Sequence, residues 1–331
     1  MKRVLFSMLL LVIVHGHAHA QAQAVPKSAQ YPVKPVRVLV PFPPGGTPDF
    51  QFRLLAEKLA PRFGQQFVVD NRAGASGNIA MEIAARAPAD GYTLIIGTVG
   101  NYAVNPHLFK LPFDVLKDLA PIINIATTPA VLVVHPSIPA ANVKELIALA
   151  QRKPGELNYG SSGVGGLGHM CAVLFSTMTG TKMTHVPYKG AAPAQTDLLG
   201  GHIQVLFNSA VPTMPHMKTG RLRALATTGA ARLHTMPDLP TVAEAGVPGY
   251  ENTTWSLISA PAHTPGPVIE QLNKAVNDAL QMPDVKERFA AAGSAVTGGT
   301  PDVARAILKS EFMKFRKLIK EAGIAAADGG S

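Results

Sequence analysis

The sequence predicts an α/β protein built on mostly parallel β-sheets, and three observations support this fold class. Segments typical of strands and of helices alternate along nearly the whole chain. The 331 residues are 47% hydrophobic, enough for the buried core of one large domain or two ordinary ones. A strand, a glycine-rich loop and a helix follow one another twice, at 36–62 and at 157–178. Ligands of open α/β sheets bind beyond the carboxyl ends of the strands, so we expect these two loops to face each other across a cleft.

The N-terminal residues have the pattern of an export signal. A basic pair precedes an apolar run at 4–14 that is too short to span a membrane. The patterns Ala-His-Ala, ending at Ala20, and Ala-Gln-Ala, ending at Ala24, have the small residues two positions apart that are typical of signal cleavage sites. We therefore expect residues 1–24 to be a signal peptide, cleaved near Ala20 or Ala24, and the mature protein to lie in the periplasm.

Charge and cysteine content narrow the class of protein further. The formal net charge is +9, or +7 without the two basic residues of the expected signal peptide. Lys and Arg are scattered and aromatic residues make up only 6% of the chain, which argues against a nucleic-acid partner. Cys171 is the single cysteine, which rules out an internal disulfide, and its apolar surroundings predict a small buried residue.

The first glycine-rich loop, PFPPGGTPD at 41–49, lies between a strand-like run at 36–40 and a helix-like run at about 50–62. Its two glycines allow a tight turn, Thr47 is a predicted N-cap, and Pro48 suits the first helical position. Unpaired N–H groups and the positive end of the helix dipole then suit an anion. An ordinary strand-to-helix turn without a ligand uses the same residue types, so the loop alone leaves both interpretations open.

The remaining elements follow from hydrophobic periodicity and from turn residues. The predicted strands cover 67–69, 93–96, 131–134, 157–159, 184–188, 203–207, 222–227 and 255–259. The predicted helices cover 76–86, 143–150, a run that ends at about 178, 192–199, 268–279 and 303–319.

The second glycine-rich loop is YGSSGVGGLGH at 159–169. Residues 163–168 formally match the dinucleotide fingerprint, but residues 183–192 contain no acidic side chain to hold a ribose. Ser161 and Ser162 lack the flanking glycines of a nucleophile elbow. We therefore expect a passive polar role, in which hydroxyl and backbone N–H groups face an acceptor; a turn without a ligand is the alternative.

Other polar residues stand where predicted strands end. Thr98, Asn101 and Asn105 follow the strand at 93–96, Tyr188 ends the strand at 184–188, and Asn208 follows the strand at 203–207. Histidines have no partners at metal-ligand spacing, and no pair of carboxylates suits acid–base chemistry. Binding is therefore favoured over catalysis, with no metal and no cofactor.

Many motifs in a fixed order carry a resemblance to a known family. They are VPFPPGG with Asp49 and Arg53, VVDNRAGASGNI at 68–79, DGYTL at 90–94, YGSSG at 159–163 with His169, HVPYKG at 185–190, DLLGG at 197–201, GRLRALATTG at 220–229, PDLPTVAEAGVPGYE at 237–251 and APAHTP at 260–265. Through nearly all of the mature chain, this sequence resembles the Bug-type extracytoplasmic solute-binding receptors of tripartite tricarboxylate transporters.

The resemblance implies a two-lobed periplasmic-binding-protein fold, similar to type II, that closes on a ligand between its lobes. The first lobe would be discontinuous, 25–127 plus 230–331, and the second would be 128–229, with hinges near Thr127 and Gly229. It implies a small carboxylate as ligand, whether a di- or tricarboxylate, an acidic amino acid or an aromatic acid. It also implies membrane transporter subunits as partners, and no enzymatic activity.

The family's ligand-binding positions carry over to two sets of residues. In the first lobe they are Pro43, Gly45, Gly46, Asp49, Thr98, Gly100, Asn101 and Asn105, and in the second lobe Ser161, Ser162, Gly163, His169, Tyr188 and Asn208. Val173 departs from the family, which often has a Glu there. Asp49 needs a partner beside an anionic ligand: backbone N–H groups, water or an ammonium group of the ligand itself.

Two other functions remain open on the same fold. One is an exported hydrolase that uses Ser161 or Ser162 with His169, although no acid stands near His169 to orient it. The other is a ligand sensor that docks to a membrane signalling protein.

Overall fold

The computed structural model describes residues 31–188 and 190–324, so the expected signal peptide lies outside the described residues. Residues from Pro32 onward form one compact unit. Strands and helices alternate through it, which confirms the α/β class. No helix in the described ranges is both long and apolar enough to cross a membrane.

The first lobe is built on strands in the order β2-β1-β3-β9-β4, with β10 beside β4. Its strands are β1 (Val36–Val40), β2 (Phe67–Asn71), β3 (Thr93–Thr98), β4 (Leu119–Val134), β9 (Thr253–Pro261) and β10 (Ala295–Val296). β1, β2 and β3 are parallel, whereas β9 runs antiparallel to both β3 and β4. The sheet is therefore mixed, and its parallel part carries the first glycine-rich loop at the end of β1.

The second lobe repeats this arrangement in the order β4-β7-β5-β6, with β8 also beside β4. Its own strands are β5 (Asn158–Ser161), β6 (Thr184–Pro187), β7 (Val205–Ser209) and β8 (Arg223–Thr227). β5 lies parallel to β6 and β7, and β4 lies antiparallel to β7 and β8. The second glycine-rich loop thus follows β5 in the same way as the first follows β1.

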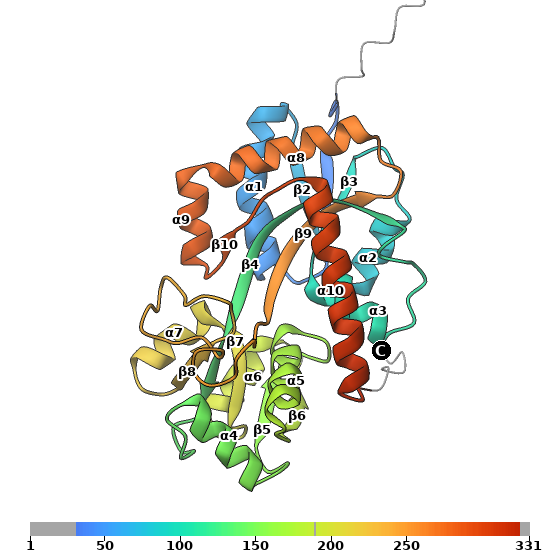
Figure 1. Cartoon of the computed structure of the whole chain (residues 1–331). Helices are drawn as coiled ribbons and strands as arrows, with labels where there is room; N and C mark the ends of the chain where they lie inside the picture. Colours follow the sequence, from blue (N-terminus) through green and yellow to red (C-terminus); the bar gives the residue numbers. More distant parts are fainter. Residues whose placement is uncertain (1–30, 189, 325–331) are drawn as a thin grey trace, which may run out of the picture. The chain divides into compact units, whose positions relative to one another are not determined.

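β4 belongs to both lobes and is much longer than the predicted strand at 131–134 (Figure 1). Its residues up to Pro129 pair with β9, and those from Ala130 pair with β7 and β8. Pro121 and Pro129 made this segment look like a loop, because proline cannot donate to a sheet ladder. The pairing with β9 shifts its register between Pro121 and Ile123, which accommodates one of the prolines.

Helices flank both lobes. Those of the first lobe are α1 (Thr47–Phe63), α2 (Asn78–Ala85), α3 (Asn105–Leu108), α8 (Gly266–Gln281), α9 (Pro283–Ala291) and α10 (Pro301–Glu321). Those of the second lobe are α4 (Val143–Arg152), α5 (Leu167–Thr179), α6 (Ala191–Leu199) and α7 (Ala210–Lys218). A 3₁₀ turn, η1 (Ala75–Gly77), precedes α2, and a π-helical segment, η2 (Gly100–Val104), precedes α3. The sequence did not predict η2, α3, α7, α9 or β10.

Apolar clusters show how the lobes are joined. Met170 and Val173 of α5 pack with Tyr102, Trp255 and Phe315, so a second-lobe helix enters the core of the first lobe. This shared cluster adds to the connection that β4 makes between the lobes.

The segment after β8 packs on the second lobe. Val242, Val247 and Tyr250 share an apolar cluster with residues of β7 and α5. The N–H of Asn252 then donates to the carbonyl of Thr228, just before β9 begins. The lobe boundaries near 127 and 229 remain predictions, and this packing favours a return passage at Asn252.

Candidate ligand-binding site

The first glycine-rich loop leads directly into α1. The helix begins at Thr47 with Gly46 as its N-cap and without a side-chain cap, so the prediction of Thr47 as N-cap was wrong. Gly45 adopts φ +84°, which glycine tolerates best. The N–H of Gly45 donates to Asp49 Oδ2 at 2.9 Å, so a side chain in the first turn fastens the loop. Pro43 is exposed on the same loop.

Asp49 is engaged within the protein. Its buried carboxylate accepts hydrogen bonds from Gly45, from Arg53 and, at 2.9 Å, from Asn71 Nδ2. The Arg53 guanidinium lies 2.9 Å from Oδ1 as an ion pair. Burial opposes ionisation, but these hydrogen bonds and the Arg53 charge outweigh it and lower the pKa of the carboxyl. The side chain therefore positions the loop, and it has the partners that a carboxylate beside an anion requires.

A strained loop at 74–77 lies beside the first glycine-rich loop. Four consecutive residues have positive φ: Gly74 +129°, Ala75 +45°, Ser76 +56° and Gly77 +87°. For Ala75 and Ser76 this conformation costs energy, and such strain is typical of functional loops. A side chain at Gly77 would overlap the Asn101 amide and lie 2.8 Å from the Pro41 Cβ atom. This segment lies in the VVDNRAGASGNI motif, but none of its residues was predicted to be part of the site.

Two asparagines of the 98–105 segment hold the strained loop. Asn101 Nδ2 and Asn105 Nδ2 donate to the Ser76 carbonyl at 3.1 and 3.0 Å. Asn101 Oδ1 also accepts from the N–H of Thr98 at 3.0 Å. Both asparagines are almost fully buried. They set the shape of the backbone around them, and their role as ligand contacts stays a prediction.

In the second loop, Ser161 is a tightly held turn residue. Its hydroxyl lies 2.6 Å from His185 Nε2, donates to the Gly163 carbonyl and accepts from the Gly163 N–H. His169, the predicted partner of a serine nucleophile, instead accepts the N–H of Gly165 on Nδ1 at 3.1 Å. Ser161 is 1% exposed. This arrangement shapes the loop and gives no support to a hydrolase.

Three rings stack behind this loop. The His185 ring centroid lies 4.8 Å from that of Tyr159 and 4.2 Å from that of His169, and the Tyr159 and His169 centroids are 6.4 Å apart. Burial lowers the pKa of His169 to about 3, with His185 a lesser cause, and burial lowers the pKa of His185 to about 4. Both are therefore neutral at neutral pH. His185 stands in the quoted HVPYKG motif, which was the signal that could have identified it.

The other second-lobe candidates differ in whether their side chains already have hydrogen-bond partners inside the protein. Ser162 is exposed. The Tyr188 hydroxyl donates to Asp197 at 2.6 Å, and its N–H donates to the Ser161 carbonyl. The Asn208 amide donates to Gln195 at 2.9 Å, and its oxygen accepts the N–H of Ser209. Of these three side chains, Ser162 is the one with no internal hydrogen bond in the described ranges.

The loops of the two lobes meet. A Cβ atom at Gly165 would lie 3.4 Å from Asn105 Oδ1, and one at Gly100 would lie 3.6 Å from the Gly165 carbonyl oxygen. Together with the contact of Gly77 on Pro41, this links four loops: 41–49, 74–78, 98–105 and 159–169. We call this meeting point the loop junction.

Unpaired backbone donors remain on these loops. Some of the expected donors are used internally, since Gly45, Gly163 and Gly165 bond to Asp49, Ser161 and His169. Within the described residues, no acceptor is found for the N–H groups of Thr47, Ala75, Ser76, Ser162 and Val164. The four loops contain neither Arg nor Lys. Chemically, the junction offers neutral donors, which suit an anion.

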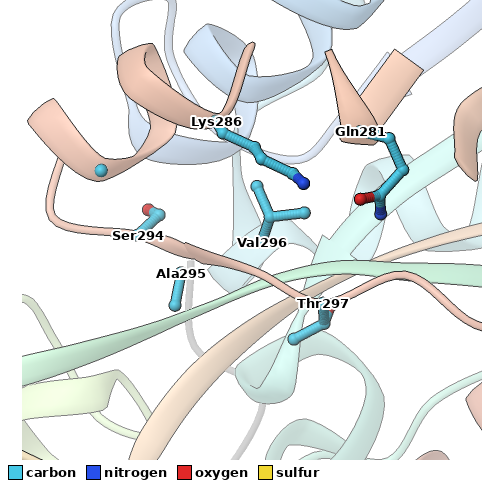
Figure 2. Close-up of a pocket in the computed structure, with 7 residues that line it drawn as sticks. Gln281, Lys286, Ser294, Ala295, Val296 and Thr297 are labelled. Carbon is cyan, nitrogen blue, oxygen red and sulfur yellow. The ribbon is translucent and has the colours of Figure 1, made fainter. Parts of the chain in front are cut away.

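The described residues offer no metal site at the junction, and one cavity lies away from it. The described ranges contain no group of three or more His, Cys, Asp or Glu that could hold a metal. Figure 2 shows a cavity of about 350 Å³ between α8, α9 and β10, where Gln281 and Lys286 face Val296. None of the predicted site residues lines it.

Comparison with known proteins gives one family and similar solved structures. The family described as the tripartite tricarboxylate transporter family receptor matches residues 51–324. The solved structure of Rpa4515 from R. palustris with adipate is 41% identical with a TM-score of 0.82, over 89% of this chain and 99% of that one. The periplasmic binding protein BugD is 32% identical with a TM-score of 0.78, over 89% and 99%. MatC from Rhodopseudomonas palustris with bound malate is 30% identical with a TM-score of 0.77, over 87% and 100%.

Proposed function

Since this chain belongs to the receptor family of the tripartite tricarboxylate transporters, we propose that it captures a small organic carboxylate at the loop junction and delivers it to membrane subunits of such a transporter. Its fold is the two-lobed fold of periplasmic binding proteins. The observation that carries the ligand class is the set of unpaired N–H groups on three of the four loops, all of which lack Arg and Lys.

One carboxylate group is assigned to the first lobe. The successive N–H groups of Ala75 and Ser76 have no acceptor among the described residues, and two neighbouring free donors suit the oxygens of a carboxylate. The N–H of Thr47 stands at the positive end of the α1 dipole. Neutral donors then replace the arginine fork that many carboxylate sites use.

A second acidic group is assigned to the second lobe. The exposed Ser162 hydroxyl and the N–H groups of Ser162 and Val164 precede the N-terminus of α5. Two donor sets, one on each lobe, suit a dicarboxylate. The solved relatives with adipate and malate support this class.

The cellular compartment and the boundaries of the two lobes are part of the same proposal. We place the mature protein in the periplasm, as the fold of BugD supports, after cleavage near Ala20 or Ala24. The first lobe comprises residues up to about 127 together with the C-terminal part, and the ligand lies between the lobes. N-terminal sequencing of the exported protein checks the cleavage site; an intact Met1 would contradict it.

A thermal-shift panel tests the ligand class. The panel contains adipate, malate, citrate, glutamate and benzoate, together with the diamide of adipate, neutral sugars and amines. At about a hundred times its dissociation constant, the correct acid should stabilise the fold by roughly 2.7 kcal/mol, whereas the diamide should not. Stabilisation by sugars or amines, with none from any acid, would contradict the proposal.

A further inference from the structure

A second pocket lies behind the loop junction, where α5 meets the C-terminal end of α10. Its volume is about 340 Å³, within the range of small-molecule sites. Tyr159, His169 and Val173 line one side, and Thr177, Lys182 and Ile324 line the rest with several smaller residues. The pocket therefore has walls from both lobes, since α5 belongs to the second lobe and the segment after α10 to the first.

Two buried side chains in this pocket, those of His169 and Tyr159, each have one polar atom without a hydrogen-bond partner among the described residues. His169 Nδ1 accepts the N–H of Gly165, so the ring carries its proton on Nε2, and no described residue accepts that proton. The Tyr159 hydroxyl also has no partner in the described ranges. Each residue is only 5% exposed. A bound group that accepts from these two donors would take the place of the water that meets them in the pocket.

Both unpaired atoms keep contact with solvent. Among the described residues, the side-chain atoms that are sealed from solvent without a partner belong to Gln51, Asn124, Asn252 and Trp255, so neither Tyr159 nor His169 is included. The pocket is the solvent space that both side chains line. Their free polar atoms are therefore available to a molecule in the pocket.

The charge and the walls of the pocket define the ligand. Lys182 is exposed and has no ion pair with a described residue, and none of the described residues that line the pocket is acidic. Val173, Met183 and Ile324 supply apolar walls. The Lys182 ammonium group and the two free donors suit an anion, and the apolar side chains suit a hydrocarbon or aromatic body.

We propose that this pocket is a second binding site, which takes a small monocarboxylate with an apolar body. The acid's carboxylate accepts from Lys182, His169 Nε2 and the Tyr159 hydroxyl, and its apolar part lies against Val173 and Ile324. The site shares Tyr159 and His169 with the second loop, whose Gly165 donates to His169 Nδ1. None of the residues with an unpaired N–H group at the loop junction lines it.

The test is a fluorine NMR titration of the full mature protein with 4-fluorobenzoate. Thr177→Trp fills the pocket, and Thr177→Val keeps its volume as the matched control. Lys182→Gln removes the positive charge of the pocket. Its control is Lys309→Gln, which removes the charge of an exposed lysine on α10 that does not line the pocket. Ser162→Asp changes the loop junction alone.

The expected result is a dissociation constant at least about tenfold higher for Thr177→Trp and several-fold higher for Lys182→Gln. Thr177→Val, Lys309→Gln and Ser162→Asp should bind as the wild type does, and 4-fluorobenzyl alcohol should bind more weakly than the acid. Three results overturn the proposal: no binding of 4-fluorobenzoate by the wild type, binding that Thr177→Trp leaves unchanged, or binding that Ser162→Asp abolishes.

Discussion

At the scale of single residues, the buried polar side chains of the junction shape the backbone. Asp49 fastens the first loop, and Asn101 and Asn105 fasten the strained loop at Ser76. Ser161 fastens the second loop through both backbone groups of Gly163. The free donors are then N–H groups, whose positions these side chains fix. Such pre-organisation lowers the cost of ordering a loop when the ligand binds.

Gly77→Ala tests the close packing of the strained loop. Because a side chain there would overlap the Asn101 amide and has an unfavourable φ, we expect a loss of about 2–4 kcal/mol in the free energy of unfolding. Gly64→Ala is the matched control, since Gly64 also has positive φ but open space around it, and it should cost only about 1 kcal/mol. Urea unfolding of both variants measures the difference. Equal losses would show that crowding at Gly77 has no effect.

Ser162→Asp tests whether the exposed serine faces the ligand. A carboxylate there repels an acidic ligand, so the acid that stabilises the wild type should lose at least about tenfold in affinity by calorimetry. The free variant should unfold as the wild type does, because Ser162 is exposed. Ser310→Asp, at an exposed serine of α10, is the control and should bind normally. Unchanged affinity in Ser162→Asp would remove this residue from the proposed site.

The sequence identified the loops better than it identified the roles of their residues. Glycine turns and strand ends mark where a ligand approaches an α/β sheet, and these are visible in the sequence. Whether Asn101 points to a ligand or to the Ser76 carbonyl depends on the fold of a segment 25 residues away. The positive φ of Ala75 is likewise imposed by contacts, since alanine has no local preference for it.

At the scale of elements, the stacked rings behind β5 and β6 link stability to pH. In the folded chain His169 and His185 stay neutral down to pKa values of about 3 and 4, whereas unfolded histidine titrates near its ordinary pKa of about 6.5. Below about pH 6.5 the unfolded chain therefore binds more protons than the folded chain. The free energy of unfolding must then fall as the pH falls, by up to about 1.4 kcal/mol per pH unit for each histidine.

Urea unfolding between pH 7 and pH 4 measures this slope. His185→Gln keeps a neutral polar side chain beside Ser161 and removes one titrating group, so it should reduce the slope by about half. His216→Gln, at a histidine of α7 outside the stack, should leave the slope as in the wild type. A wild-type stability that stays constant over this pH range would contradict the burial of the two rings.

The predictability of the elements followed their local signals. β1, α1 and α4 have clear hydrophobic periodicity and flanking turn residues, and each was predicted close to its observed bounds. The first part of β4 contains two prolines and was missed, because its strand conformation depends on pairing with the distant β9. The π-helical η2 was missed because it has no sequence signature of its own. In the fold it packs against the distant α10.

At the scale of the whole molecule, the lobes share more than a hinge. β4 pairs with strands of both lobes, and Met170 of α5 also enters the core of the first lobe. We expect the chain to return to the first lobe near Asn252, because the segment before it packs on the second lobe. Separating the lobes on this side exposes that apolar surface to water, which costs roughly 25 cal/mol for each Å². The shared cluster therefore opposes opening in the free protein.

Small-angle scattering of Met170→Ala tests this restraint. We expect the wild-type radius of gyration to change little on saturation with ligand. The variant loses the shared contact, at a cost of about 2–4 kcal/mol in stability, and its free form should be larger than its liganded form. Met313→Ala, at an exposed methionine of α10, is the control and should behave as the wild type. A large ligand-induced decrease in the wild type itself would contradict the restraint.

The most direct test of the central claim is a crystal structure of the protein with the acid that stabilises it most. We predict carboxylate oxygens within about 2.7–3.2 Å of the N–H groups of Ala75 and Ser76 on one side and of Ser162 or Val164 on the other. Arg53 should remain paired with Asp49. A ligand held instead by Arg53, released from Asp49, or bound away from these loops would contradict the account.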